Sequence, residues 1–252
     1  QLRARDAQAN RLEHRLRHTC EDVSWIVREK LGDEARLDSD LRQLASVPRT
    51  LAIMFSERSD WTESQLDEYL RAMLDADPRL FGMCVAFEPY RFDSERENYA
   101  RYICRHPDGI ELKYLHPPSY RLYRDWNWYR SPKADGRARW SEPYIDEGGG
   151  EVPMVTYSVP FQRDDQFTGV VTADLSLAYL RKLKTWLDEL KLARGDYGFV
   201  ISSAGTFISD ANPDYQMRRR ITDFTGPELD PGYSALFELI QHQESGSVKG
   251  ID

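Results

Sequence analysis

The sequence predicts an α+β fold in which helices precede an antiparallel sheet and a smaller unit of the same kind follows. Three patterns support this class. Apolar residues recur at helix spacing before Pro78, short apolar runs with turn signals between them begin near Leu80, and a strand–turn–strand pattern returns after Gly195. At 252 residues the chain is long enough for one large domain or two small ones.

The first stretch of the chain predicts a helix of about thirty residues, which would be ~45 Å long. Charged residues separate apolar residues that recur at helix spacing. Two arrangements fit this pattern: the helix lies along two stacked modules and continues toward a membrane, or it forms a coiled coil. Its apolar stripe also suits dimerisation. The apolar positions are Leu2, Ala9, Leu12, Leu16, Val23, Ile26, Val27 and Leu31.

Two shorter helices are expected next. The first covers residues 38–45 and should stop near Pro48, because proline interrupts the hydrogen bonding of a helix. The second begins at Thr62, which is followed three residues later by Gln65, a spacing typical of a capping box. This helix should end before Pro78.

The middle of the chain has the pattern of an antiparallel sheet. Residues 81–87 form a short apolar run, as a buried strand does. Residues 99–105 and 110–115 flank an Asp-Gly turn, which is a hairpin signal. Residues 152–161 and 167–174 flank a polar turn and predict a second hairpin.

Ser176 is expected to cap a further helix with one apolar face. A second, smaller unit follows, in which residues 197–203 and 206–209 predict a hairpin and Pro231 opens a last helix. The sequence therefore divides into a helical segment at 1–79, a larger module at 80–190 and a smaller module at 191–252.

The composition limits the classes of protein to consider. Hydrophobic residues make up 40% of the chain and charged residues 30%, as in a globular protein rather than a disordered one. The net charge of -8 argues against a general nucleic-acid-binding role. No apolar run approaches the ~20 residues of a membrane helix. The chain begins at Gln1 and ends at Asp252, just after a strand-like run, so we expect it to be an excised part of a larger protein.

The three cysteines have no spacing typical of a metal site. Cys84 and Cys104 fall in consecutive predicted strands, so either a cross-strand disulfide or two buried free thiols would fit. The sequence contains no GxSxG, P-loop, GxGxxG or HExxH motif. It therefore predicts neither a cofactor nor a metal.

The window from Trp126 to Glu147 combines aromatic rings with carboxylates. Such rings beside carboxylates can form a cage for a small cation, because both attract positive charge. In the competing interpretation the rings pack in the core and the carboxylates are solvated. The residues concerned are Trp126, Trp128, Tyr129, Trp140, Tyr144, Asp146 and Glu147.

Asp174 ends an alternating run in which Val170, Thr172 and Asp174 share one face of the strand. A carboxylate in this position requires a cation, N–H donors or water, because burial without a partner is costly. Capping of the following helix is a competing and compatible role. Together with Asp146 and Glu147, Asp174 would also suit a carboxylate-based hydrolase, which is a further alternative.

The order of these pieces resembles the double Cache domain, a PAS-like extracytoplasmic sensor of bacterial transmembrane receptors. The resemblance covers essentially the whole chain. The stretches that carry it are Trp140 to Gly150, Thr156 to Pro160, Gly169 to Asp174, Tyr197 to Phe199 and Gly205 to Ile208.

The resemblance implies a long N-terminal helix followed by two tandem PAS-like modules, of which the membrane-distal one holds the ligand and the smaller one is membrane-proximal. It implies transmembrane helices beyond both ends, a periplasmic location in an inner-membrane receptor, and a cytoplasmic output domain such as a histidine kinase or a serine phosphatase. The sensor part itself is then expected not to be an enzyme. A dimerisation or protein-interaction module without a small ligand is the alternative.

Amino-acid-sensing members of this family carry an arginine two residues before a Trp-Tyr pair, a later tyrosine and an aspartate at the end of a late strand. Trp126 stands where that arginine is expected, so a carboxylate-binding donor is replaced by an apolar ring. With this departure the resemblance predicts a small amine or quaternary ammonium ligand in preference to an amino acid, while an amino acid or a small carboxylate is the alternative. The expected ligand-binding residues are Trp126, Trp128, Tyr129, Tyr144, Asp146, Tyr157 and Asp174.

Overall fold

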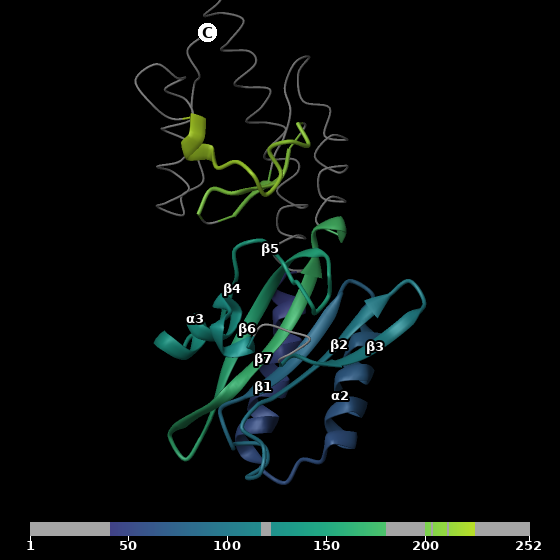
Figure 1. The fold of residues 1–252 in the computed structure, drawn as a ribbon, viewed down its shortest axis with the longest axis vertical. Coiled ribbons are helices and arrows are strands. Elements are labelled where there is room, and N and C mark those ends of the chain that lie inside the picture. The colour runs from purple at the N-terminus through teal and green to yellow at the C-terminus, as the bar shows by residue number, and fades with distance from the viewer. Residues whose placement is uncertain (1–40, 117–121, 180–199, 203, 211, 225–252) are drawn as a thin grey trace, which may run out of the picture.

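The computed structural model describes residues 41–116, 122–179, 200–202, 204–210 and 212–224 (Figure 1). The long helix predicted at the start of the chain lies outside the described residues. So do most of the helix predicted after Ser176 and the helix predicted from Pro231. Within the described residues, no helix combines the length and the apolar character needed to cross a membrane.

The first described helix is longer than the sequence predicts. Residues 41–57 are helical, so the helix continues through Pro48 instead of stopping before it. The reason is burial: Leu44, Leu51 and Phe55 recur on one face and are fully enclosed by the core. The apolar area that they bury outweighs the backbone hydrogen bond that the proline removes.

Helix α2 (Glu63–Ala76) begins and ends where the sequence predicts. The Thr62 hydroxyl accepts a hydrogen bond from the Gln65 backbone N–H (3.3 Å), and the Gln65 side chain accepts one from the Thr62 N–H (3.1 Å). The predicted capping box is therefore confirmed. Its buried face consists of Leu66, Leu70 and Leu74.

An antiparallel sheet forms the centre of the described fold, with the strand order β3-β2-β1-β7-β6-β4 and with β5 also paired to β6. Both predicted hairpins are confirmed. In the second hairpin Asp164 and Asp165 have φ angles of 49° and 57°, as a type I′ turn requires. The strands are β1 (Gly82–Phe87), β2 (Tyr99–His106), β3 (Gly109–Tyr114), β4 (Arg139–Trp140), β5 (Tyr144–Ile145), β6 (Pro153–Arg163) and β7 (Gln166–Ser176).

The two faces of this sheet are covered by different elements (Figure 1). The helix of residues 41–57 and α2 pack on one face and enclose the main apolar core. The short helices η1 (Tyr123–Asp125) and α3 (Asn127–Asp135) lie against the other face, where α3 contacts β6 and β7. We call this second side the pocket face, because the polar side chains of the sheet gather there.

A separate hairpin follows the main sheet and consists of β8 (Val200–Ile201) and β9 (Phe207–Ser209). It is followed by the short helix η2 (Ile221–Phe224). The predicted hairpin is therefore present, while much of the predicted second module lies outside the described residues. Cys84 and Cys104 are buried free thiols, so the disulfide alternative is excluded.

Candidate functional site

A chain of hydrogen bonds crosses the pocket face and ends at a buried carboxylate. Thr156 on β6 lies directly opposite Asp174 on β7, and its hydroxyl donates to Asp174 Oδ1 (2.8 Å). The Tyr144 hydroxyl lies 2.8 Å from the same Thr156 oxygen. The following helix is capped by Ser176, whose hydroxyl accepts from the Tyr179 N–H (3.3 Å). The Asp174 side chain is therefore directed into the pocket face and does not cap that helix.

Asp174 fits beside β1 because its cross-strand neighbour is a glycine. Gly82 pairs with Asp174, and a Cβ atom on Gly82 would lie 2.5 Å from the Tyr102 hydroxyl and 2.9 Å from Asp174 Oδ2. Any larger residue would fill the space that these two polar groups occupy.

A second buried carboxylate, Asp146, is held by the glycine turn that follows β5. Asp146 is only 3% exposed, and its Oδ2 accepts a hydrogen bond from the Gly150 N–H (2.8 Å). A Cβ atom on Gly149 would lie 2.0 Å from the same oxygen. The Lys113 ammonium donates to the Gly149 carbonyl (2.8 Å) and ties the turn to β3. The glycine run therefore provides an N–H donor and the room for this carboxylate.

Replacement of Gly149 by alanine should displace the Asp146 side chain. The new methyl group overlaps a buried carboxylate, and overpacking of this kind costs about 1–3 kcal/mol. We expect a lower melting temperature by thermal unfolding. Glu147→Ala, an exposed change in the same turn, is the control and should shift the free energy of unfolding by less than about 0.5 kcal/mol. Equal stability of the two variants would show that Asp146 does not depend on Gly149.

The inner chamber between these carboxylates carries concentrated negative potential. Burial, together with the charge of Asp146, raises the pKa of Asp174 from 3.8 to about 7, although the hydrogen bond from Thr156 partly opposes the rise. Burial, followed by the same two carboxylates, also raises the pKa of the Cys84 thiol and of the Tyr102 hydroxyl well above their usual values. Among the described residues, no lysine, arginine or histidine forms an ion pair with Asp174.

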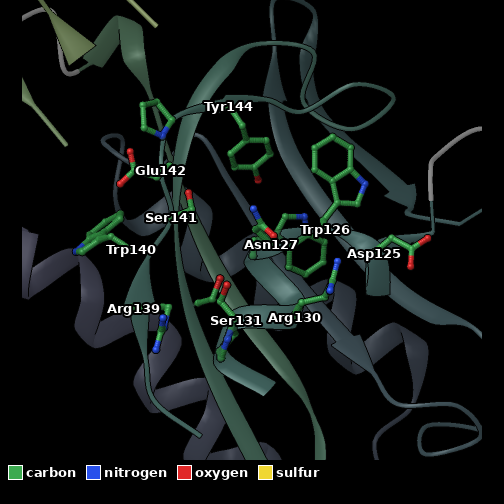
Figure 2. A pocket seen from close by; sticks show the side chains of 14 residues that line it. Asp125, Trp126, Asn127, Arg130, Ser131, Arg139, Trp140, Ser141, Glu142 and Tyr144 are labelled. Carbon is green, nitrogen blue, oxygen red and sulfur yellow. The ribbon is translucent and has the colours of Figure 1, made fainter. Parts of the chain in front are cut away.

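The inner chamber adjoins a larger outer pocket of about 540 Å³ (Figure 2). The inner chamber has only about 10 Å³ of free space, barely enough for one water molecule. Trp128 and Tyr144 contribute to both walls and separate the two spaces. The rings of Trp126 and Tyr144 are in tilted contact, with their centroids 5.6 Å apart, and both line the outer pocket beside the inner chamber.

Five of the seven predicted ligand-binding residues come together here. Tyr129 and Tyr157 do not line either space. The Tyr129 hydroxyl donates to Glu88 (2.7 Å), and Tyr157 lies on the helix side of the sheet, where Arg49 donates to its hydroxyl. Trp126, Trp128, Tyr144, Asp146 and Asp174 line the outer pocket, the inner chamber or both.

Several lining residues were not singled out from the sequence. Thr156 and Ser158 point to the pocket face from β6, next to Asp174 and Thr172 of β7. The Ser158 hydroxyl is buried and lines the outer pocket, and it has no hydrogen-bond partner among the described residues. Strand alternation signals these positions, because polar side chains that alternate with apolar ones on a central strand face a polar site.

The arginines near the window differ in position. Arg124 binds Glu97 and Asn98 outside the pocket, while Arg130 lines it (Figure 2). Glu147 is exposed and lines neither space, so the three carboxylates considered for hydrolysis are not gathered at one site.

Residues 66–182 match the model of the first PDC sensor domain of methyl-accepting-chemotaxis-protein-like receptors. These residues are similar to a PDC-type sensor domain. The sheet and pocket described above lie within or beside the matched range. This match supports the prediction of an extracytoplasmic sensor domain of this broad type.

The chain is similar in sequence to a chemoreceptor. The methyl-accepting chemotaxis protein TlpQ of Pseudomonas aeruginosa is 24% identical over 208 residues, which are 73% of this chain and 28% of that protein. The chain thus spans less than a third of the length of this relative.

The fold of this chain is also similar to that of solved structures, among them the following two. The extracellular domain of the proposed histidine kinase mmHK1S-Z3 superposes with a TM-score of 0.71 at 23% identity, over 84% of this chain and 77% of that one. The ligand-binding domain of the Pseudomonas aeruginosa amino acid chemoreceptor PctC, in complex with GABA, has a TM-score of 0.54 at 19% identity, over 80% and 83%.

Proposed function

We propose that this chain is the ligand-sensing part of a membrane-bound receptor and that it binds a small amine or quaternary ammonium compound on the pocket face. One observation carries the proposal. Asp174 is buried beside a ring-bordered pocket and makes no ion pair with a described residue, although a buried carboxylate is costly to ionise without a cation.

A bound cation would remove this cost. Its positive charge would stabilise the ionised form of Asp174, and Asp146 would add to the attraction. The faces of Trp126, Trp128 and Tyr144 border the approach from the outer pocket and would attract the same charge. A carboxylate ligand would instead meet like charge at the inner chamber.

Entry of the ligand requires a local rearrangement. The inner chamber has room for one water molecule at most, and the hydrogen bond between Tyr144 and Thr156 closes its outer side. A ligand ammonium would compete with Thr156 for Asp174 and would move the Tyr144 ring as it enters. The outer pocket would hold the remainder of the molecule.

An amino acid is the second candidate, and Arg130 is the observation that favours it. PctC binds GABA, which carries both an amine and a carboxylate. In this chain Trp126 occupies the position where the family resemblance expects the carboxylate-binding arginine, but Arg130 lines the outer pocket. A ligand carboxylate there could pair with its guanidinium.

Four ligands of equal chain length separate these candidates. Thermal unfolding would be measured with n-butylamine, butyltrimethylammonium, 4-aminobutanoate and butanoate. We expect stabilisation by the first two, which should reach about 2.7 kcal/mol at a concentration 100 times the dissociation constant. Stabilisation by 4-aminobutanoate alone would select the amino acid candidate. Stabilisation by butanoate would contradict both.

The receptor context completes the proposal. Residues 80–190 would be the membrane-distal module and residues 191–252 a smaller membrane-proximal module of a double Cache sensor, with the helical segment 1–79 along them. Transmembrane helices would flank both, and the output would be of histidine kinase, phosphatase or chemoreceptor type. Ligand binding would shift the long helix relative to the smaller module, and the same helix would support a homodimer. A sensor that dimerises but binds none of the four ligands would favour the protein-interaction alternative.

A further inference from the structure

Glu142 connects the pocket wall to the separate hairpin of β8 and β9. Its Oε2 accepts hydrogen bonds from the Ser202 hydroxyl and from the Thr206 hydroxyl (3.3 Å), and its Oε1 accepts one from the Ala204 N–H (3.3 Å). The Ser202 hydroxyl in turn accepts from the Thr206 N–H (3.0 Å). One carboxylate therefore satisfies donors on both sides of the turn of this hairpin.

The segment from Glu142 to Tyr144 also connects to Asp174, the carboxylate proposed to bind the ligand. Glu142 and Tyr144 both line the outer pocket and are separated only by Pro143, which stiffens the connection (Figure 2). Tyr144 lies 2.8 Å from Thr156, and Thr156 donates to Asp174. A continuous series of contacts thus runs from the carboxylate at the inner chamber to the hairpin.

The attachment matters because the hairpin has little structure of its own. Strands β8 and β9 have two and three residues, and an isolated two-stranded hairpin is marginally stable. Charge-assisted hydrogen bonds from a carboxylate are stronger than neutral ones. The three donors held by Glu142 are therefore expected to decide how well the turn is ordered.

We propose that Glu142 is a positioning residue that links ligand binding at Asp174 to the order of the β8–β9 hairpin. The proposal rests on the proposed amine-binding function for its ligand. In the ligand-free state Glu142 holds the hairpin and Tyr144 closes the inner chamber. An amine that takes the place of the Thr156 donor moves Tyr144, pulls on Glu142 and loosens the hairpin. Because such coupling is reciprocal, loosening the hairpin favours the amine.

The first test uses no ligand and measures amide hydrogen exchange in the hairpin by NMR. Glu142→Gln should increase the exchange rates of the Ala204 and Thr206 amides about threefold to tenfold, as loss of one such hydrogen bond predicts. Thr156→Val, on the pocket side, should also increase them. Thr168→Val is the matched control, because Thr168 is buried on β7 and, within the described part of the chain, its hydroxyl donates only to the Gln166 carbonyl (3.0 Å). Equal exchange in the Thr156 and Thr168 variants would overturn the proposal.

The second test measures the affinity for n-butylamine by calorimetry. Ser202 lines neither the outer pocket nor the inner chamber, yet Ser202→Ala should tighten amine binding about threefold, as Glu142→Gln should. The double variant should bind no more tightly than Glu142→Gln alone. An effect of Glu142→Gln without any effect of Ser202→Ala would mean that Glu142 acts on the pocket alone and would overturn the link. If no amine binds the wild type, the proposed function fails, while the exchange measurement still decides the link.

Discussion

We expect an Asp174→Asn variant to fold normally and to bind amines about 100-fold more weakly than the wild type. Asparagine keeps the size of the side chain and an oxygen that accepts the hydrogen bond from Thr156. It removes the negative charge, and hydrogen bonds to a charged group contribute about 1.5–3 kcal/mol. Titration calorimetry with n-butylamine measures the loss, and far-ultraviolet circular dichroism checks the fold.

Asp108→Asn is the matched control for this experiment. Asp108 lies in the β2–β3 turn and its side chain is almost fully exposed, so its charge is screened from the pocket. We expect wild-type affinity in this variant. Normal amine binding by Asp174→Asn would instead mean that the buried carboxylate is a structural group and that the amine binds elsewhere.

Local chemistry explains which parts of the fold could be predicted from the sequence. The Asp-Gly turn of the first hairpin and the capping box at Thr62 depend on neighbouring residues alone, and the structure has both. Pro48 gives an equally local signal, but it is overruled by the burial of Leu44 and Phe55 on the same helix. Burial depends on what packs against the helix, which local patterns do not contain.

In the site, too, some features follow from the local sequence and others depend on distant parts of the chain. Asp174 and its strand alternation point to a polar face, but Tyr157 is adjacent to Thr156 on β6, and successive side chains of a strand face opposite ways. Tyr129 follows Trp128 on α3, where successive side chains are about 100° apart around the helix. A shift of one position along a strand or helix is thus enough to place the ring of Tyr157 or Tyr129 outside the pocket. The attachment of Glu142 to Ser202 joins residues sixty positions apart and has no local signal.

The same asparagine variant should be more stable than the wild type at alkaline pH. The pKa of Asp174 is about 7 in the folded chain and 3.8 ordinarily, so the folded state keeps a proton that the unfolded state has lost between these values. The free energy of unfolding then falls as pH rises through this range, by about 1.4 kcal/mol per pH unit. Asparagine does not titrate and avoids this loss.

The difference in the free energy of unfolding between Asp174→Asn and the wild type isolates the titration of Asp174, because all other titratable groups are common to both proteins. From pH 5 to pH 8 the stability of Asp174→Asn relative to the wild type should increase by about 3 kcal/mol and then level off above the folded pKa. Urea unfolding at several pH values measures it. A constant difference across this range would mean that Asp174 titrates near its ordinary pKa and is not held in a desolvated chamber.

The affinity for an amine must also depend on the proton of Asp174, but it should rise with pH over the range in which the free energy of unfolding falls. An alkylamine, with a pKa of about 10, stays charged throughout this range, so it requires the ionised form of Asp174. Below the folded pKa, binding must therefore expel one proton, and the affinity of the wild type should fall up to about tenfold per pH unit. Calorimetry in two buffers of different ionisation enthalpy should detect nearly one proton released at pH 6 and almost none at pH 8. Release of no proton at pH 6 would show that the ammonium does not pair with Asp174, because a cation cannot share this chamber with the neutral acid without losing most of its attraction.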